Sequence, residues 1–144
     1  MTTIAYDGEY LVGDKQWTHY EQTPVSAQKI FLIENNDVFQ AIGFAGNPDS
    51  LYEVLRQLED SKYPIKLEEK SIEFNALLID YLGGAWLITK HGEPQPVPTP
   101  WAIGSGSQFA LGAMEAGATA IEAVCIATIF DISTGLGYDE IKID

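Results

Sequence analysis

The sequence has little positive charge and a single cysteine. Its 144 residues include 8 Lys and Arg against 21 Asp and Glu, which gives a formal net charge of −13. Such an acidic surface repels polyanions, so we expect neither a nucleic-acid partner nor binding to an anionic membrane. The lone Cys125 cannot form an internal disulfide, which fits a reducing, cytoplasmic compartment. Because its neighbours Val124 and Ile126 are apolar, we expect Cys125 to be buried.

Long apolar runs and histidine clusters are also missing. No stretch is long enough to cross a bilayer, and the first ten residues lack the pattern of a signal peptide. The two histidines, His19 and His91, fall in different predicted loops, so we expect neither a Ser-His-Asp triad nor a metal site. Gly104-Ser105-Gly106 is too short for a dinucleotide or P-loop fingerprint. We therefore predict that the protein uses no metal and no cofactor.

The sequence does contain a series of short strand patterns. Hairpins are predicted over residues 2–13, 26–43 and 72–89, with turns at Asp7-Gly8, Asn35-Asn36-Asp37 and Gly83-Gly84. Further strands are predicted over 101–104 and 138–143. Loops are expected over 14–24 and 61–70, and the proline-rich segment 93–100 can be neither helix nor central strand.

Helical patterns are fewer. One helix is predicted from Pro48-Asp49 to residue 60, and two more over 108–130, with Gly117 as the break between them. Because strands occur in hairpins and helices are segregated, we expect one α+β domain over residues 1–144, with antiparallel sheets. The three tryptophans, Trp17, Trp86 and Trp101, are expected in the core or at an interface.

Chemistry is first indicated by Met1-Thr2-Thr3. Methionine before a small residue is usually removed, and that would leave Thr2 with a free α-amine. The amine has an ordinary pKa of about 7.7–8.0, close to working pH, where a general base is most effective. A terminal threonine therefore supplies both a nucleophile and a base. Threonine is also common at position two without any function, so this signal depends on its context.

The context is a series of short motifs in a fixed order: Thr2-Thr3-Ile4, Gly13-Asp14, Lys29, Gly43-Phe44-Ala45-Gly46 and Ala102-Ile103-Gly104-Ser105-Gly106. Each motif is weak alone, but the series resembles the proteasome β-subunit and HslV family of N-terminal nucleophile hydrolases. The resemblance runs from Thr2 to about Asp131, with a gap in the middle. The family has two long helices after the Gly-Phe-Ala-Gly segment, whereas only residues 49–60 read as helix here.

The resemblance implies a role for each matching residue. Thr2 matches the nucleophile, Asp14 the acidic residue beside it, and Lys29 the lysine beneath it. A cation there would keep the terminal amine neutral, and Asp14 would hold Lys29 charged. Without the motif order, Asp14 and Lys29 would be read as a surface ion pair of little energetic value.

Five further residues receive roles in the same way. Gly46 matches the glycine whose N–H faces the oxyanion, and Phe44 lines the first specificity pocket. Ser105 matches the serine near the threonine amine, and Asp131 and Ser133 match the segment that completes the polar network. Simpler readings stay open: a tight turn for Gly46, a helix cap for Ser105 and a helix end for Asp131.

The resemblance implies a four-layer αββα sandwich that hydrolyses peptide bonds through an acyl-enzyme on Thr2. It also implies peptide or unfolded-protein substrates and a homo-oligomer, with an ATPase unfoldase as a candidate partner. The exposed face of helix 49–60 and the segment 93–100 are candidate contact surfaces. Two alternatives are a catalytically silent scaffold of the same fold and a small-molecule amidase.

Overall fold

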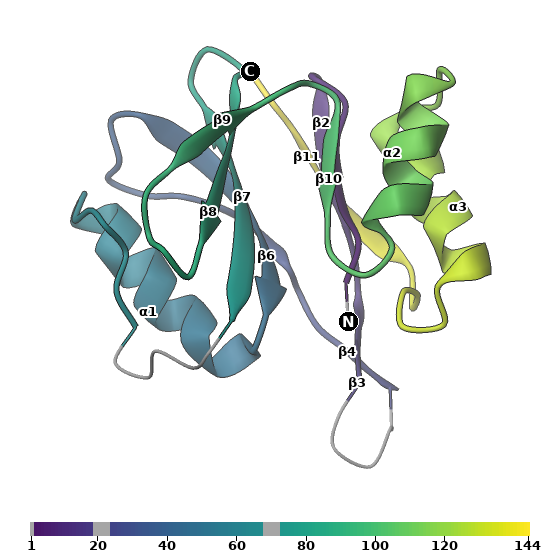
Figure 1. Ribbon diagram of the computed structural model, residues 1–144, viewed down its shortest axis with the longest axis horizontal. Coiled ribbons are helices and arrows are strands. Elements are labelled where there is room, and N and C mark those ends of the chain that lie inside the picture. Colours follow the sequence, from purple (N-terminus) through teal and green to yellow (C-terminus); the bar gives the residue numbers. More distant parts are fainter. Residues whose placement is uncertain (1, 19–23, 68–72) are drawn as a thin grey trace.

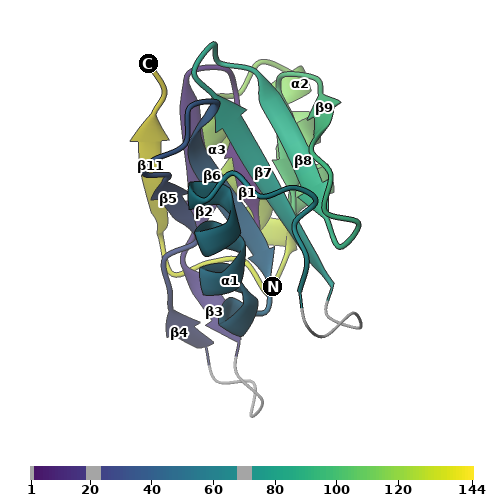
Figure 2. The same cartoon turned by 90° about the vertical axis from the view of Figure 1, so that its left-hand side faces the viewer.

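The computed structural model describes residues 2–18, 24–67 and 73–144. Two antiparallel sheets pack face to face between helices, with α1 on one outer side and α2 and α3 on the other (Figure 1). The order of layers is therefore helix, sheet, sheet, helix, which is the predicted αββα sandwich. Figure 2 shows the molecule from the side that α1 covers.

The first sheet carries the N-terminal residues. Its strands lie in the order β10-β1-β2-β11, with bounds Trp101–Ile103, Ile4–Tyr6, Tyr10–Asp14 and Tyr138–Lys142. Asp7-Gly8 forms the β1–β2 turn, as predicted, and the Asp7 carboxylate accepts the N–H groups of Glu9 and Tyr10 at 2.8 Å each. The pairing of β1 with both β2 and β10 fixes Thr2 and Thr3 at the start of an inner strand of this sheet.

The second sheet has five strands in the order β5-β6-β7-β8-β9. Their bounds are Ile30–Leu32, Phe39–Gly46, Phe74–Asp80, Ala85–Thr89 and Gln95–Val97. Both predicted hairpins are present, and the proline-rich segment forms the edge strand β9, where a missing N–H is tolerated. The central strands β6 and β7 are buried over most of their length, as expected for a sheet covered on both faces.

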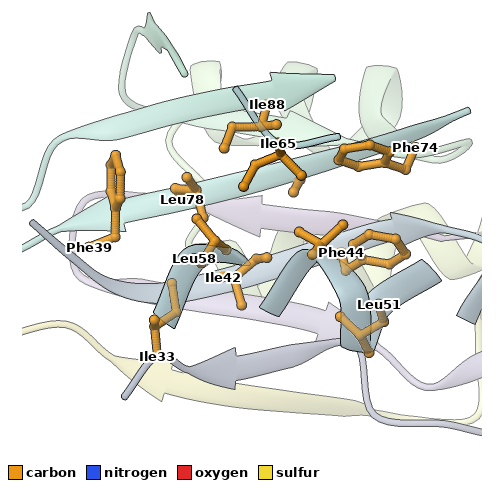
Figure 3. Packing of buried hydrophobic residues seen from close by; sticks show 12 residues of the cluster. Ile33, Phe39, Ile42, Phe44, Leu51, Leu58, Ile65, Phe74, Leu78 and Ile88 are labelled. Atoms are coloured by element: carbon orange, nitrogen blue, oxygen red, sulfur yellow. The ribbon is translucent and has the colours of Figure 1, made fainter. Parts of the chain in front are cut away.

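Helix α1, Pro48–Glu59, is an amphipathic surface helix with a complete start signal. Asn47 caps it by accepting the N–H of Asp49 at 2.9 Å, and Pro48 occupies the first turn. Its buried residues include Leu51, Val54 and Leu58, which recur at helical spacing. Figure 3 shows Leu51 and Leu58 packed with Phe44, Ile42 and other side chains of the sheet.

Helices α2, Ser107–Glu115, and α3, Ala120–Phe130, cover the other face of the first sheet. The break falls at Gly117, whose φ of +107° suits a helix end that favours glycine. A capping box at Thr119 and Glu122 starts α3. None of the helices in the described part of the chain is long and apolar enough to span a membrane.

Two predictions are changed by the structure. Residues expected to be a loop form a two-stranded hairpin, β3 Gln16–Thr18 and β4 Pro24–Ser26, while His19 lies outside the described residues. Cys125 is exposed, so the prediction of a buried cysteine was wrong. Helix α3 is apolar almost all round, and its sequence therefore did not reveal which face points outward.

Candidate active site

Thr2 lies two residues before β1 and is almost entirely buried, with 6% of its surface exposed. Its backbone N–H donates to Ser105 Oγ at 3.2 Å, and its carbonyl accepts the N–H of Gly106 at 3.3 Å. A side chain at Gly104 or Gly106 would collide with this segment, because an added Cβ would lie 2.0 Å from the Thr2 carbonyl oxygen or from Thr3 Oγ1. The glycines around Ser105 therefore allow the loop to lie directly against Thr2.

A buried ion pair lies at the end of β2. Asp14 Oδ1 accepts Lys29 Nζ at 2.8 Å, and the Asp14 and Lys29 side chains are 0% and 7% exposed. The Asp14 carboxylate also accepts three backbone N–H groups. They come from Thr3 at 2.9 Å and from Gln16 and Gly135 at 3.1 Å each. Lys29 also donates to the carbonyl of Gln16. Burial lowers the pKa of the Lys29 ammonium, while the carboxylate of Asp14 opposes that shift by stabilising the charged form.

A second polar cluster follows α3. Asp131 Oδ2 accepts Ser105 Oγ at 2.6 Å and Thr134 Oγ1 at 2.7 Å, and Oδ1 accepts the N–H of Ser133 at 3.1 Å. Because the single hydroxyl proton of Thr134 goes to Asp131, Thr3 Oγ1 must be the donor in the 2.8 Å contact between the two threonines. Partial burial raises the pKa of Asp131, but the hydrogen bonds from Ser105, Thr134 and Ser133 outweigh it and lower the pKa overall.

These contacts form a continuous chain of hydrogen bonds from Thr2 N–H through Ser105 Oγ to the Asp131 carboxylate. The predicted residues Ser105 and Asp131 therefore meet next to Thr2, although 103 residues separate Thr2 and Ser105 along the chain. Ser133 enters the cluster through its backbone N–H. Thr134 was not singled out in the sequence; it is 3% exposed, and a threonine so deeply buried needs polar partners.

The N–H of Gly46 points toward the same region. Within a strand, residues two apart direct their N–H groups to the same edge. The N–H of Phe44 donates to the carbonyl of Lys29 on the β5 side, at 2.9 Å, so that of Gly46 faces the same side. Beyond this point the chain turns into α1, and Thr2, Lys29 and Gly46 line one pocket.

Two hollows meet at Thr2. One is a small pocket of about 40 Å³ with Lys29, Phe44, Leu51 and Trp17 in its wall. The other is an open cleft of about 480 Å³ that includes Gly46, Asn75 and Ser105. Trp17 lines both hollows, although it was expected in the core or at an interface. The sequence did not single out Trp17 as a site residue, because its hairpin was not predicted.

No protein-family model and no curated protein matches the sequence. The structure, in contrast, matches HslV from Trypanosoma brucei with a TM-score of 0.77 and 23% identity, over 99% of this chain and 98% of that chain. The chain has the HslV fold. It also matches BPH from Thiobacillus denitrificans, free (TM-score 0.69) and in complex with epoxomicin (TM-score 0.71), at 19% identity over 99% of this chain and 97% of that chain.

Among the described residues between β6 and β7, this chain has one helix, α1. Residues 61–67 form no helix, and residues 68–72 lie outside the described part. The sequence also predicted a single helix here. The structure brings together all the predicted site residues: Thr2, Asp14, Lys29, Phe44, Gly46, Ser105, Asp131 and Ser133.

Proposed function

We propose that the protein is an N-terminal threonine peptidase of the cytoplasm, with Thr2 as nucleophile after removal of Met1. The observation that carries this proposal is the position of the Thr2 nitrogen, 3.2 Å from Ser105 Oγ, beside a pocket that Thr2 shares with Lys29 and Gly46. Met1 lies outside the described residues. Its removal would turn the Thr2 amide nitrogen into an amine at the same place.

In the first step, Thr2 Oγ1 attacks the carbonyl carbon of the peptide and its proton passes to the α-amine. The amine then gives that proton to the leaving amino group, and the C–N bond breaks. An ester between Thr2 and the acyl part of the substrate remains. Water, deprotonated by the same amine, attacks the ester, releases the acid product and restores the threonine hydroxyl.

The surrounding residues favour these steps. The Lys29 ammonium near Thr2 disfavours a second positive charge, so it keeps the amine neutral and basic. Gly46 lines the pocket, where its N–H would stabilise the oxyanion, and Phe44 lines the pocket for the substrate side chain. Ser105, Asp131 and Ser133 form the hydrogen-bonded chain that orients the amine.

Covalent labelling tests the nucleophile. The probe is epoxomicin, a peptide epoxyketone that is found in complex with BPH of the same fold. We expect intact-mass analysis to show loss of Met1 and one adduct, which peptide mapping assigns to Thr2. The matched control is Thr99→Ala, an exposed threonine before β10, at the end of that strand opposite Ser105. An adduct on another residue, or equal labelling of Thr2→Ala, would contradict the proposal.

We further propose that the protein forms a homo-oligomer through the outer face of α2 and α3. An exposed apolar patch lies where α2 begins and α3 ends: Phe109, Ile129, Phe130 and Ile132, with Ile132 93% exposed. Phe109 and Phe130 stack with ring centroids 5.3 Å apart. A helix that is apolar all round is normally covered on all sides, so α3 lacks a partner for this face.

The lack of charge on this face allows a second copy of this chain to be that partner. With a net charge of −13, two copies repel each other over most of their surfaces. Helices α2 and α3 contain only two charged residues, Glu115 and Glu122, at the ends away from the patch. Because Phe130 and Ile132 flank Asp131, contact here would also fix the polar cluster beside Thr2. In an assembly that encloses the site, extended peptides or unfolded protein are the substrates that can enter. For folded substrates we propose an ATPase unfoldase as the partner.

Sedimentation velocity at micromolar concentration tests the assembly. We expect a species several times larger than 15.8 kDa, and a shift to monomer for Ile129→Glu, because a charge in an apolar interface is costly. Tyr52→Glu, on the exposed face of α1, is the matched control. If the native chain sediments as a monomer, the proposed assembly is refuted. If Tyr52→Glu alone dissociates the oligomer, the interface lies on α1 instead.

A further inference from the structure

The small pocket beside Thr2 is closed on one side by Trp17. Both this pocket and the open cleft touch Thr2, and Trp17 is in the wall of both. The indole therefore lies at the junction through which a substrate side chain passes from the cleft into the pocket. An extended substrate in the cleft would place the side chain preceding the cleaved bond at this junction.

The remaining apolar walls are fixed by the core. Phe44 is 4% exposed and stacks on Phe74 with ring centroids 5.7 Å apart and planes inclined by 14°. Leu51 is 8% exposed and packs from α1 against the same cluster (Figure 3). Neither side chain can move away without opening a cavity in that core.

Trp17 is attached differently. It lies on β3, which pairs with β4 in a hairpin of its own, and its cross-strand neighbour Val25 is 37% exposed. In Figure 1 this hairpin projects beyond the two main sheets. The size of the pocket is therefore set by one large side chain outside the main core, which can be replaced without disturbing the clusters under α1.

The volume of the pocket decides which side chains fit. The pocket is small, with about 40 Å³ free against about 480 Å³ in the cleft. It therefore suits small side chains such as those of Ala, Ser or Val better than the ring of Phe or Tyr. Lys29 adds no demand for an acidic side chain, because its ammonium already donates to Asp14 at 2.8 Å and to the carbonyl of Gln16.

We propose that Trp17 is a specificity-determining residue that restricts cleavage to bonds following small, uncharged side chains. This inference rests on the proposed peptidase activity for its biological meaning, but the pocket itself can be tested without turnover. Replacing the indole by a methyl group joins the pocket to the cleft. Larger apolar side chains then become acceptable, since each methylene that fits an apolar pocket improves selectivity by roughly tenfold or more.

The experiment compares two fluorogenic peptides that differ only in Ala or Phe before the cleaved bond. We expect the native protein to favour the Ala peptide in kcat/KM by at least tenfold, and Trp17→Ala to reduce that ratio by roughly tenfold or more. Val25→Ala is the matched control, because it alters the same hairpin and leaves the indole in place. It should keep the native ratio.

The outcomes separate the two proposals. A native preference for Phe, an unchanged ratio in Trp17→Ala, or the same change in Val25→Ala overturns the role of Trp17. If neither peptide is hydrolysed, the peptidase proposal fails, and calorimetric titration of both peptides still tests the pocket. Tighter binding of the Ala peptide, reversed in Trp17→Ala, supports the inference; equal binding or no binding overturns it.

Discussion

Two polar clusters meet at the N-terminal residues, and they differ in how deeply they are buried. The Asp14–Lys29 pair is closed off from water, with exposures of 0% and 7%, and it contacts Thr3 through the backbone. The Ser105–Asp131 pair is partly open to solvent and contacts Thr2. Burial makes a charge dependent on its partners, whereas solvent can replace a lost partner. The first cluster should therefore affect folding as well as chemistry, and the second mainly chemistry.

The largest effect is expected for Asp14→Ala. It leaves the Lys29 ammonium buried without its carboxylate and removes the acceptor of three backbone N–H groups. Breaking a buried pair in this way costs about 3–5 kcal/mol, measured as the change in the free energy of unfolding in urea. Asp139→Ala is the control, because Asp139 lies 3.8 Å from Lys15 and both side chains are 35% exposed. It should lower the free energy of unfolding by less than about 1 kcal/mol. Similar small losses in both variants would contradict the dependence of buried Lys29 on Asp14.

A smaller loss of stability is expected for Lys29→Met. Asp14 keeps its three backbone donors, so we expect about 1–3 kcal/mol, but most peptide hydrolysis should be lost. The residual activity should rise at higher pH than in the native protein, because removing a nearby cation makes the Thr2 amine easier to protonate. Lys15→Met serves as the control. Full activity with an unshifted pH profile is the result that rejects the role of Lys29.

The smallest change in stability is expected for Asp131→Asn. Hydrogen bonds lower the pKa of Asp131 in the fold, so between its folded and unfolded values the unfolded chain binds more protons. The stabilisation from this carboxylate is thus present above pH about 4 and is lost as the pH falls further. We expect Asp131→Asn to flatten the acid side of the stability curve, recorded by thermal unfolding from pH 2 to 7. Asp139→Asn is the reference, and an equal flattening there would contradict the assignment.

Local sequence determined most of the elements, because their signals depend on neighbouring residues. The Asp7-Gly8 and Asn35-Asn36-Asp37 turns, the Asn47-Pro48 start of α1 and the break at Gly117 are set by backbone preferences and short hydrogen bonds. The resemblance carried by the short motifs also predicted a site that contains Thr2, Asp14, Lys29, Ser105 and Asp131.

Only the tertiary structure decided which distant residues complete the site. Thr134 lies 131 residues from Thr3 in the sequence, and its role as the link to Asp131 follows from sheet pairing and the return of the chain after α3. Trp17 belongs to a three-residue strand, too short for a periodic pattern, and reaches the pocket through the position of its hairpin. The exposure of Cys125 has the same cause. Helix α3 is apolar almost all round, so its sequence indicates only that the helix is buried. Packing against the first sheet decides which face of α3 is exposed.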